Sequence, residues 1–185
     1  MLVMGPSTAF KFMGGATWLD LLATSGRTFG VDPIERLGTP DDLRRWLDAV
    51  GLGPAEPVSE RDRAAAIALR EALREAAMSA VAHRECERGA VAMIDAAIAR
   101  SSGSVRLGGG GVRTAGGALG LIARQAVLTL VGPDRAMLKQ CAEHDCRWVF
   151  LDPGGRRKWC PEPTCATRGR VRAYRARATS SPRLP

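Results

Sequence analysis

The sequence predicts a mainly α-helical protein with small β elements, an α+β arrangement in which an α-rich N-terminal domain precedes a small cysteine-rich module. Apolar residues recur at helical spacing over much of the region between residues 40 and 131. Four of the five cysteines lie between residues 141 and 165, and the excess of positive charge lies after residue 155. We expect the boundary between residues 135 and 136, which gives domains 1–135 and 136–185.

The N-terminal segment predicts a strand, a turn and a buried element. Phe10 and Phe12 alternate with polar neighbours, which favours a short strand. A turn is expected at Gly14 and Gly15. The apolar residues within 18–22 then predict a buried strand or helix.

The next helix carries clear signals at both ends. Thr39 is placed to cap it, Pro40 suits its first position, and Asp42 lies in its first turn. Gly51 is expected to close it.

A long alanine-rich helix follows. Ser59 and Asp62 resemble a capping box, and apolar residues continue at helical spacing to Val81. A break is expected around residues 84–89, before a further helix over residues 91–98. We expect these two helices to pack as an antiparallel pair.

A glycine-rich segment, residues 101–117, comes next. It fits neither phosphate-loop pattern, because no Lys follows a glycine in the required place and the GxGxxG spacing is broken at 113–114. A glycine hairpin between two short strands is therefore expected rather than a nucleotide site. Residues 118–131 predict a buried helix that Gly132 ends, and residues 133–140 predict a short helix or strand.

Charge is distributed unevenly along the chain. The net charge is +8, yet residues 1–155 hold 18 basic and 18 acidic side chains, whereas residues 156–185 hold nine basic side chains and one acid, Glu162. We expect such a tail to bind a polyanion, and nucleic acid is the first candidate. The candidate contacts are Arg156, Arg157, Lys158, Arg168, Arg170, Arg172, Arg175 and Arg177.

The clustered cysteines occur in two pairs at metal-ligand spacing. Four residues separate Cys141 from Cys146 and Cys160 from Cys165, and thirteen lie between the pairs. Two short loops that each present two thiolates can surround one tetrahedral ion, with Zn–S distances of about 2.3 Å. The sequence therefore predicts one structural Zn²⁺ on these four side chains.

The expected surroundings agree with a metal site. The sequence has no apolar run of the roughly 20 residues needed to cross a bilayer and no secretory start, so we expect a cytoplasmic protein with no membrane partner. Short cysteine spacings in that reducing setting favour metal ligation over disulfides.

The cysteine pattern has alternative explanations. Two disulfides or four unrelated thiols would give the same count, and a catalytic zinc would normally keep one open position with His or carboxylate ligands. His144 could replace a cysteine as ligand but is expected to face solvent within the first loop. Cys86 has no cysteine neighbour and is expected to lie partly buried on a helix.

The residues around the cysteines predict the order of a treble-clef zinc finger. A knuckle over residues 142–145 is followed by a strand over 147–152 and a turn over 152–155. Residues 156–160 predict the returning strand. The prolines near 161–163 open a final helix that reaches about residue 178.

The final helix has two stripes at helical spacing. One is basic, with Arg168, Arg172 and Arg175. The other is apolar, with Val171, Tyr174 and Ala178. Docking of the apolar stripe on the hairpin would leave the arginines as an exposed cationic ridge suited to phosphate. The alternative is a solvated, charge-rich terminal helix.

At these residues the chain resembles the CGNR zinc-finger family of bacterial proteins classed as transcriptional regulators. The likeness covers the paired cysteines, the RWVF segment with Asp152, the basic residues before WC at 159–160, and the terminal VRAYRAR. The segments GGATWLDLLAT, TPDDLRRWL and LREALR are similar to that family's stress-regulator-like companion domain. The chain departs at the CGNR signature, which reads Cys165, Ala166, Thr167, Arg168.

The resemblance implies a regulator that binds DNA and whose N-terminal domain senses a signal. Our first hypothesis joins a DNA-binding zinc module to a domain that senses a small-molecule effector or mediates association, such as a homodimer. The second is an adaptor whose zinc finger docks an acidic protein. We do not expect an enzyme, because the clustered reactive side chains are committed to zinc.

Overall fold

The computed structural model describes residues 9–101 and 112–180, with side chains up to residue 177. Its α-helices are α1 (Thr17–Leu22), α2 (Pro40–Ala49), α3 (Glu60–Val81), α4 (Arg88–Ala99), α5 (Ala115–Val131) and α6 (Pro163–Ser180), and the 3₁₀ helix η1 spans Pro133–Met137. Two antiparallel sheets have two strands each: β1 (Ser25–Gly26) with β2 (Ile34–Glu35), and β3 (Leu138–Gln140) with β4 (Val149–Leu151). The predicted class, mainly α with small β elements, is confirmed.

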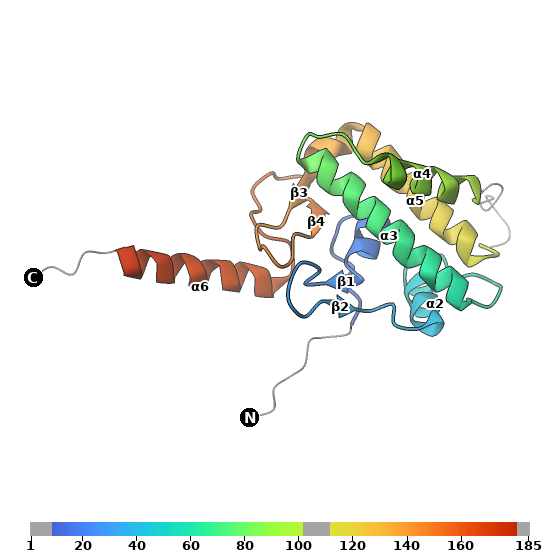
Figure 1. Cartoon of the computed structure of the whole chain (residues 1–185), viewed down its shortest axis with the longest axis horizontal. Coiled ribbons are helices and arrows are strands. Elements are labelled where there is room, and N and C mark those ends of the chain that lie inside the picture. The colour runs from blue at the N-terminus through green and yellow to red at the C-terminus, as the bar shows by residue number, and fades with distance from the viewer. Residues whose placement is uncertain (1–8, 102–111, 181–185) are drawn as a thin grey trace, which may run out of the picture.

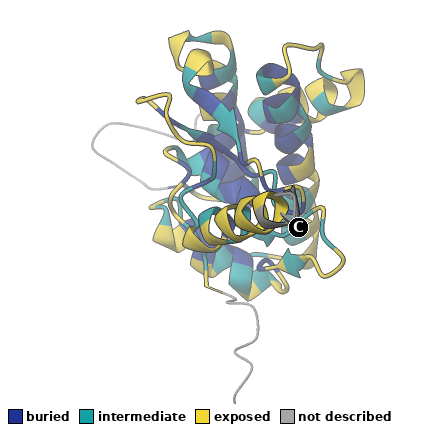
Figure 2. Ribbon diagram, turned by 90° about the vertical axis from the view of Figure 1, so that its left-hand side faces the viewer, coloured by how far each residue is buried: buried dark blue, intermediate teal, exposed yellow. Residues whose placement is uncertain are grey.

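Helix α3 is the centre of the fold. It contacts α1, α2, α4, α5 and β3, and the long helices α3, α4 and α5 lie side by side in the main body (Figure 1). The faces that these helices turn toward one another are buried, whereas α6 is mostly exposed (Figure 2). None of the helices in the described ranges is both long and apolar enough to cross a membrane.

Small residues let α4 and α5 approach closely. A Cβ atom at Gly120 of α5 would lie 2.5 Å from the Ala97 carbonyl oxygen of α4 and 2.5 Å from the Ser101 Cβ. Only a glycine fits this crossing, because real Cβ contacts do not come this close.

The predicted cap at Thr39 and the predicted capping box of Ser59 and Asp62 are confirmed, and Thr39 forms a capping box as well. The Thr39 hydroxyl accepts a hydrogen bond from the Asp42 N–H at 3.2 Å, and the Thr39 N–H donates to the Asp42 carboxylate at 2.9 Å. Ser59 and Asp62 make the same pair of bonds at 3.2 and 2.9 Å. These reciprocal bonds satisfy N–H groups that the helices leave unpaired, so α2 and α3 begin where the sequence predicts.

The first predicted strand is wrong. Residues 10–12 form no strand, and the apolar run at 18–22 belongs to α1. Phe10 and Phe12 instead make an edge-to-face contact with ring centroids 6.3 Å apart. No strand of the described chain pairs with this segment, and a lone strand leaves its backbone groups unpaired. The predicted glycine hairpin lies mainly in residues 102–111, outside the described residues.

Two buried arginines of α3 bind α1 and the small sheet β1–β2, which no sequence pattern predicted. Arg70 donates to both carboxylate oxygens of Glu35, at 2.8 and 2.7 Å, and to the Thr24 hydroxyl at 3.1 Å. Arg74 donates to the Leu22 carbonyl at the end of α1, at 3.1 Å. Buried guanidinium groups need such partners, so the Arg70 bonds fix the sheet against α3 and the Arg74 bond fixes α1 against it.

Asp20 lies partly buried beneath the glycine turn, where its carboxylate accepts a hydrogen bond from the Gly14 N–H at 2.7 Å. Burial raises the pKa of Asp20 from 3.8 to about 6, against the lowering effect of the backbone bonds at Gly14 and Met13. The folded protein therefore holds a proton that the unfolded chain loses at lower pH.

This raised pKa predicts a pH-dependent stability. The contribution of Asp20 is fully present below pH 3.8 and is lost as the pH rises through about 6. Asp20→Asn keeps an acceptor oxygen and does not ionise, so the variant should gain in Tm relative to the parent between pH 5 and pH 7.5. Thermal unfolding at both pH values measures this, and a Tm difference that does not change with pH would contradict the assignment.

Candidate metal centre

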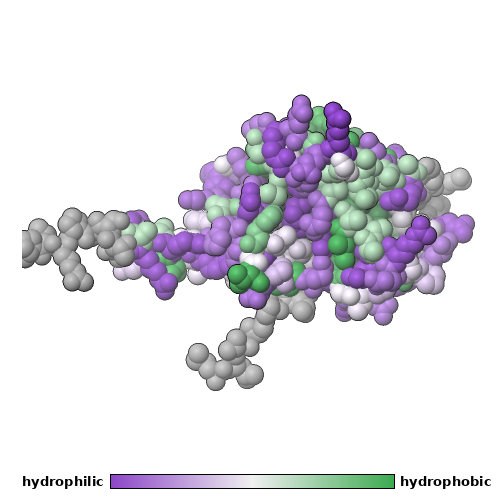
Figure 3. All heavy atoms as spheres, in the orientation of Figure 1, coloured by the Kyte–Doolittle hydropathy of each residue, from purple (hydrophilic) through white to green (hydrophobic). Residues whose placement is uncertain are grey.

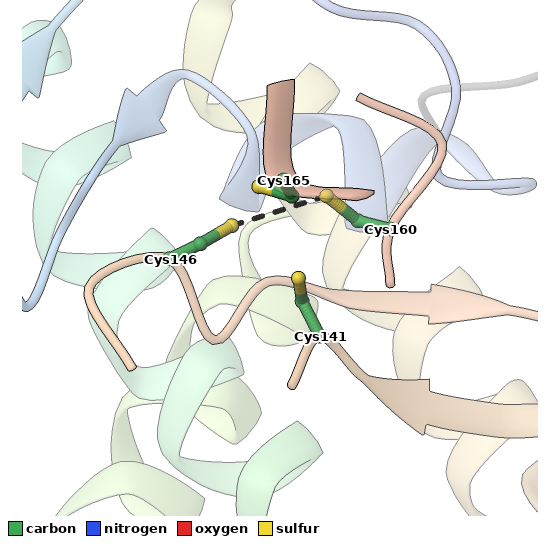
Figure 4. Close-up of side chains that lie close together, drawn as sticks. All are labelled: Cys141, Cys146, Cys160 and Cys165. Atoms are coloured by element: carbon green, nitrogen blue, oxygen red, sulfur yellow. Dashed lines mark hydrogen bonds between the residues drawn. The ribbon is translucent and has the colours of Figure 1, made fainter. Parts of the chain in front are cut away.

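The four clustered cysteines converge on one point. Their Sγ atoms all lie within 4.8 Å of one another, and the Sγ atoms of Cys146 and Cys160 are 3.9 Å apart (Figure 4). A tetrahedron with Zn–S distances of about 2.3 Å has sulfur–sulfur distances of about 3.8 Å. The cluster therefore has the size of a Cys₄ zinc site, and Cys86 is not part of it.

Local structure positions each sulfur. Cys141 follows β3, and its N–H donates to the Trp148 carbonyl at 2.8 Å, which closes the first knuckle. Cys146 ends that knuckle with an N–H bond to the Glu143 carbonyl at 3.1 Å. Cys165 is the third residue of α6, so the positive end of the helix dipole favours its thiolate.

A bound cation would stabilise the sulfur cluster. Hydrogen bonds between the sulfurs lower the pKa of Cys141 and raise the pKa values of Cys146 and Cys160, so the four thiols do not ionise together on their own. A divalent ion removes this conflict, because it binds thiolates and releases their protons. Three of the four side chains are buried, as expected of a structural site.

The strand pairing differs from the prediction. Residues 156–160 form no returning strand, and β4 pairs instead with β3, in the register Lys139 with Phe150. The hairpin therefore encloses the first knuckle rather than following it.

Two sets of bonds explain this difference. The outer edge of β4 is used by the body of the protein, because the Leu151 N–H donates to the Gly14 carbonyl at 2.9 Å. Asp152 then turns the chain away, since its carboxylate accepts the Arg157 N–H at 2.7 Å. The following segment reaches the knuckle through one bond, from the Ala142 N–H to the Lys158 carbonyl at 3.1 Å.

The first knuckle is acidic and binds α6, an interaction that the sequence analysis missed. Arg168 donates to both oxygens of Asp145, at 2.5 and 3.0 Å, and to the Cys165 sulfur at 3.6 Å. Arg172 pairs with buried Glu143 and lies 3.1 Å from the His144 ring nitrogen. We call this set of contacts the knuckle clamp.

The knuckle clamp is electrostatically strong. Although burial acts to raise the pKa of Asp145, the hydrogen bonds from Arg168 lower it below its ordinary value. The same bonds raise the pKa of Arg168. A bidentate guanidinium–carboxylate pair also fixes direction, so α6 leaves the zinc site at a defined angle.

The predicted docking of α6 is therefore wrong. The expected apolar stripe does not pack on the hairpin, since Val171 is 44% and Tyr174 70% exposed. Two residues of the expected cationic ridge, Arg168 and Arg172, turn toward the knuckle. The physical reason is the negative charge of the knuckle carboxylates Glu143 and Asp145, which need cationic partners. The apolar stripe of α6 is too short to outweigh this pairing.

The other predicted nucleic-acid contacts are exposed. They are Arg156, Arg157, Lys158, Arg170, Arg175 and Arg177. Lys158 and Arg170 lie over the ring of Trp159, at 5.5 and 6.0 Å from its centre. Trp159 also packs against the backbone of α6, where a Cβ atom at Gly169 would lie 2.4 Å from its ring nitrogen.

Sequence comparison assigns both parts of the chain. Residues 137–178 match the CGNR zinc finger, and residues 15–133 match the ABATE family, described as a putative stress-induced transcription regulator. The chain belongs to the ABATE family. The resemblance seen in the sequence is thereby confirmed, and no curated protein matches the chain.

This ABATE protein carries a zinc finger whose four cysteines fit one structural zinc ion. The CGNR signature reads CATR here, and the two replaced positions are accommodated in the first turns of α6. The Thr167 hydroxyl donates to the Pro163 carbonyl at 3.1 Å. The retained arginine, Arg168, makes the bidentate bond of the knuckle clamp.

Loss of one sulfur tests the zinc site. Cys160→Ser should lower the zinc content well below one ion per chain and reduce the free energy of unfolding by more than about 4 kcal/mol, because metal binding is coupled to folding. Cys86→Ser is the matched control and should change neither quantity. Metal analysis and urea unfolding measure both, and full zinc content in the Cys160 variant would argue against the site.

Gly169 gives a separate test of how α6 docks. Helix propensity alone predicts that Gly169→Ala stabilises the protein by up to about 1 kcal/mol. The contact with Trp159 predicts the opposite, a loss of about 1–3 kcal/mol, because the new methyl group displaces the ring. Urea unfolding followed by tryptophan fluorescence decides between them, and a gain in stability would show that the docking is wrong.

Proposed function

We propose that this ABATE protein is a transcription regulator that binds DNA through its zinc finger and α6. The observation that carries the proposal is the combination of a rigidly held helix with exposed cations. Helix α6 projects from the main body (Figure 1), and hydrophilic side chains line much of its described surface (Figure 3). The regulator description of the family and the positive C-terminal charge support the same proposal.

The contacts proposed for DNA phosphates are the exposed cations. Arg156, Arg157 and Lys158 lie on the loop before Cys160, and Arg170, Arg175 and Arg177 lie along α6. Arginine suits phosphate because its fork donates two hydrogen bonds and stays charged. Arg168 and Arg172 receive a different role: they orient α6 through the knuckle clamp.

Zinc has a structural role in this proposal. Four thiolates fill the tetrahedral coordination of the ion and leave no position for a substrate, which argues against catalysis at the metal. The ion instead joins the knuckle, the Cys160 loop and the start of α6. The treble-clef description remains our proposal for this arrangement of a knuckle and a helix start.

We also propose the division into domains 1–135 and 136–185. The two parts share one core, since Trp148 donates to the Leu19 carbonyl at 3.2 Å and Phe150 is fully buried. A structural change in the N-terminal part should therefore alter the structure of the finger.

A protein-binding adaptor is the second candidate. Exposed Val171 and Tyr174 among the arginines of α6 favour it, because an acidic partner with apolar side chains could cover both kinds of residue. Salt dependence separates the two candidates, since DNA binding weakens log-linearly with salt, with a slope near −0.9 per phosphate neutralised.

Charge removal on the exposed loop tests DNA binding. Arg156→Gln combined with Arg157→Gln should weaken binding of duplex DNA by roughly tenfold or more and reduce the salt slope by about 2, one unit for each phosphate contact. Arg61→Gln combined with Arg124→Gln removes equal charge from exposed positions on α3 and α5 and should have little effect. Fluorescence anisotropy over a salt series measures both, and equal losses in the two variants would contradict the proposed interface.

A further inference from the structure

A cavity of about 470 Å³ lies between the N-terminal part and the zinc finger. Its lining comes from the segment between Lys11 and Arg36, which includes β1 and β2, and from the finger between Cys146 and Arg168. The volume is in the range of small-molecule sites, roughly 300–1,000 Å³.

The cavity walls combine cations with apolar side chains. Four cationic residues line it: Lys11, Arg27, Arg36 and Arg168. Ala23, Ile34 and Trp148 supply apolar surface, and Glu162 is the one acidic residue of the lining.

Each of these four cations has carboxylates near it, and Glu35 near Arg36 and Glu143 near Arg168 are among them. Glu162 pairs with Lys11 at 3.1 Å and also faces Arg36 electrostatically. Asp145 pairs with Arg168, and its Oδ2 lies 3.9 Å from the Arg27 Nε.

Two guanidinium nitrogens of this wall have no hydrogen bond despite the nearby carboxylates. The Nε atoms of Arg27 and Arg168 are buried and have no hydrogen-bond partner in the described part of the chain. An exposed carboxylate, Asp32, reaches Arg27 only at 4.0 Å. Buried guanidinium donors without acceptors are costly, so an additional anion in the cavity would be stabilised.

Arg36 adds a desolvated charge to this wall. It is 8% exposed, and the acceptors of its guanidinium include the Ala9 and Ala23 carbonyls, at 2.9 and 3.1 Å. Burial lowers the pKa of Arg36, against the raising effect of Glu162 and Glu35. Position 26, next to Arg36, requires a glycine, because a Cβ atom there would lie 2.7 Å from the Arg36 Nη1.

The negative charge of the zinc thiolates does not explain why four cations line the cavity. Arg168 lies 3.6 Å from the Cys165 sulfur and compensates the site directly. The acidic partners of Lys11 and Arg36 are carboxylates instead.

We propose that this cavity binds a small organic acid, with its carboxylate against Arg27 and Lys11 and its apolar body against Ile34 and Trp148. Glu162, Thr164, Cys165 and Arg168 belong to the cavity and also to the start of α6 or the residue before it, so the ligand would contact the element that we assign to DNA binding. Coupling to DNA rests on the proposed function, whereas ligand binding itself does not.

The test uses the zinc-loaded full chain and three probes: 2-naphthoate, its uncharged analogue 2-naphthamide, and inorganic phosphate. Calorimetry should show that one 2-naphthoate binds per chain, at least tenfold more tightly than either of the other probes. Arg27→Gln and Lys11→Gln should each weaken 2-naphthoate binding about fivefold or more, and Arg124→Gln, on exposed α5, should not. Zinc content and the thermal transition confirm that each variant is folded.

Several results would overturn the proposal. Equal binding of the acid and the amide would show that the cations do not select the ligand, and a preference for phosphate would remove the apolar contact. Absence of 2-naphthoate binding, or unchanged affinity in both the Arg27 and Lys11 variants, would remove the site. None of these measurements contains DNA, so their failure leaves the proposed DNA interface standing, and loss of DNA binding leaves the cavity proposal standing.

Discussion

The convergence of four cysteine sulfurs on one cation is the constraint on which the rest of the C-terminal structure depends. The sulfurs come from three separate places: the knuckle between β3 and β4, the loop that ends at Cys160, and the first turn of α6. Zinc binding supplies on the order of 10 kcal/mol to units of this kind. About fifty residues bury too little apolar surface to hold these pieces together without it.

The knuckle clamp fixes the direction in which α6 leaves the metal site. Zinc fixes where α6 starts, and the bonds from Arg168 and Arg172 to the acidic knuckle fix where it points. The bond from the Leu151 N–H to the Gly14 carbonyl then ties the same knuckle hairpin to the helical body. The shared core provides the contact between the N-terminal part and the start of α6 that the proposed function requires.

The sequence predicted best those features that depend on neighbouring residues. Cysteine spacing identified the metal site, and the Ser59–Asp62 box located the start of α3, because both patterns are complete within a few residues. The returning strand at 156–160 was wrong because Gly14, far away in the chain, already occupies the edge of β4. Such a contact leaves no local pattern.

The orientation of α6 was wrong for a different reason. Helical spacing correctly grouped Arg168 with Arg172, but no pairing of these arginines with the knuckle was predicted. Glu143 and Asp145 were the available signal, because carboxylates between two zinc ligands attract the nearest arginines. No sequence pattern predicted the cationic cavity, because Lys11, Arg36 and Arg168 line the same space only in the folded chain.

X-ray absorption at the zinc edge of the purified full chain tests the central claim most directly. The structure predicts one zinc per chain with four sulfur neighbours at about 2.3 Å and no nitrogen or oxygen neighbour. A first shell that contains nitrogen or oxygen, or a chain that folds without bound metal, would contradict the account.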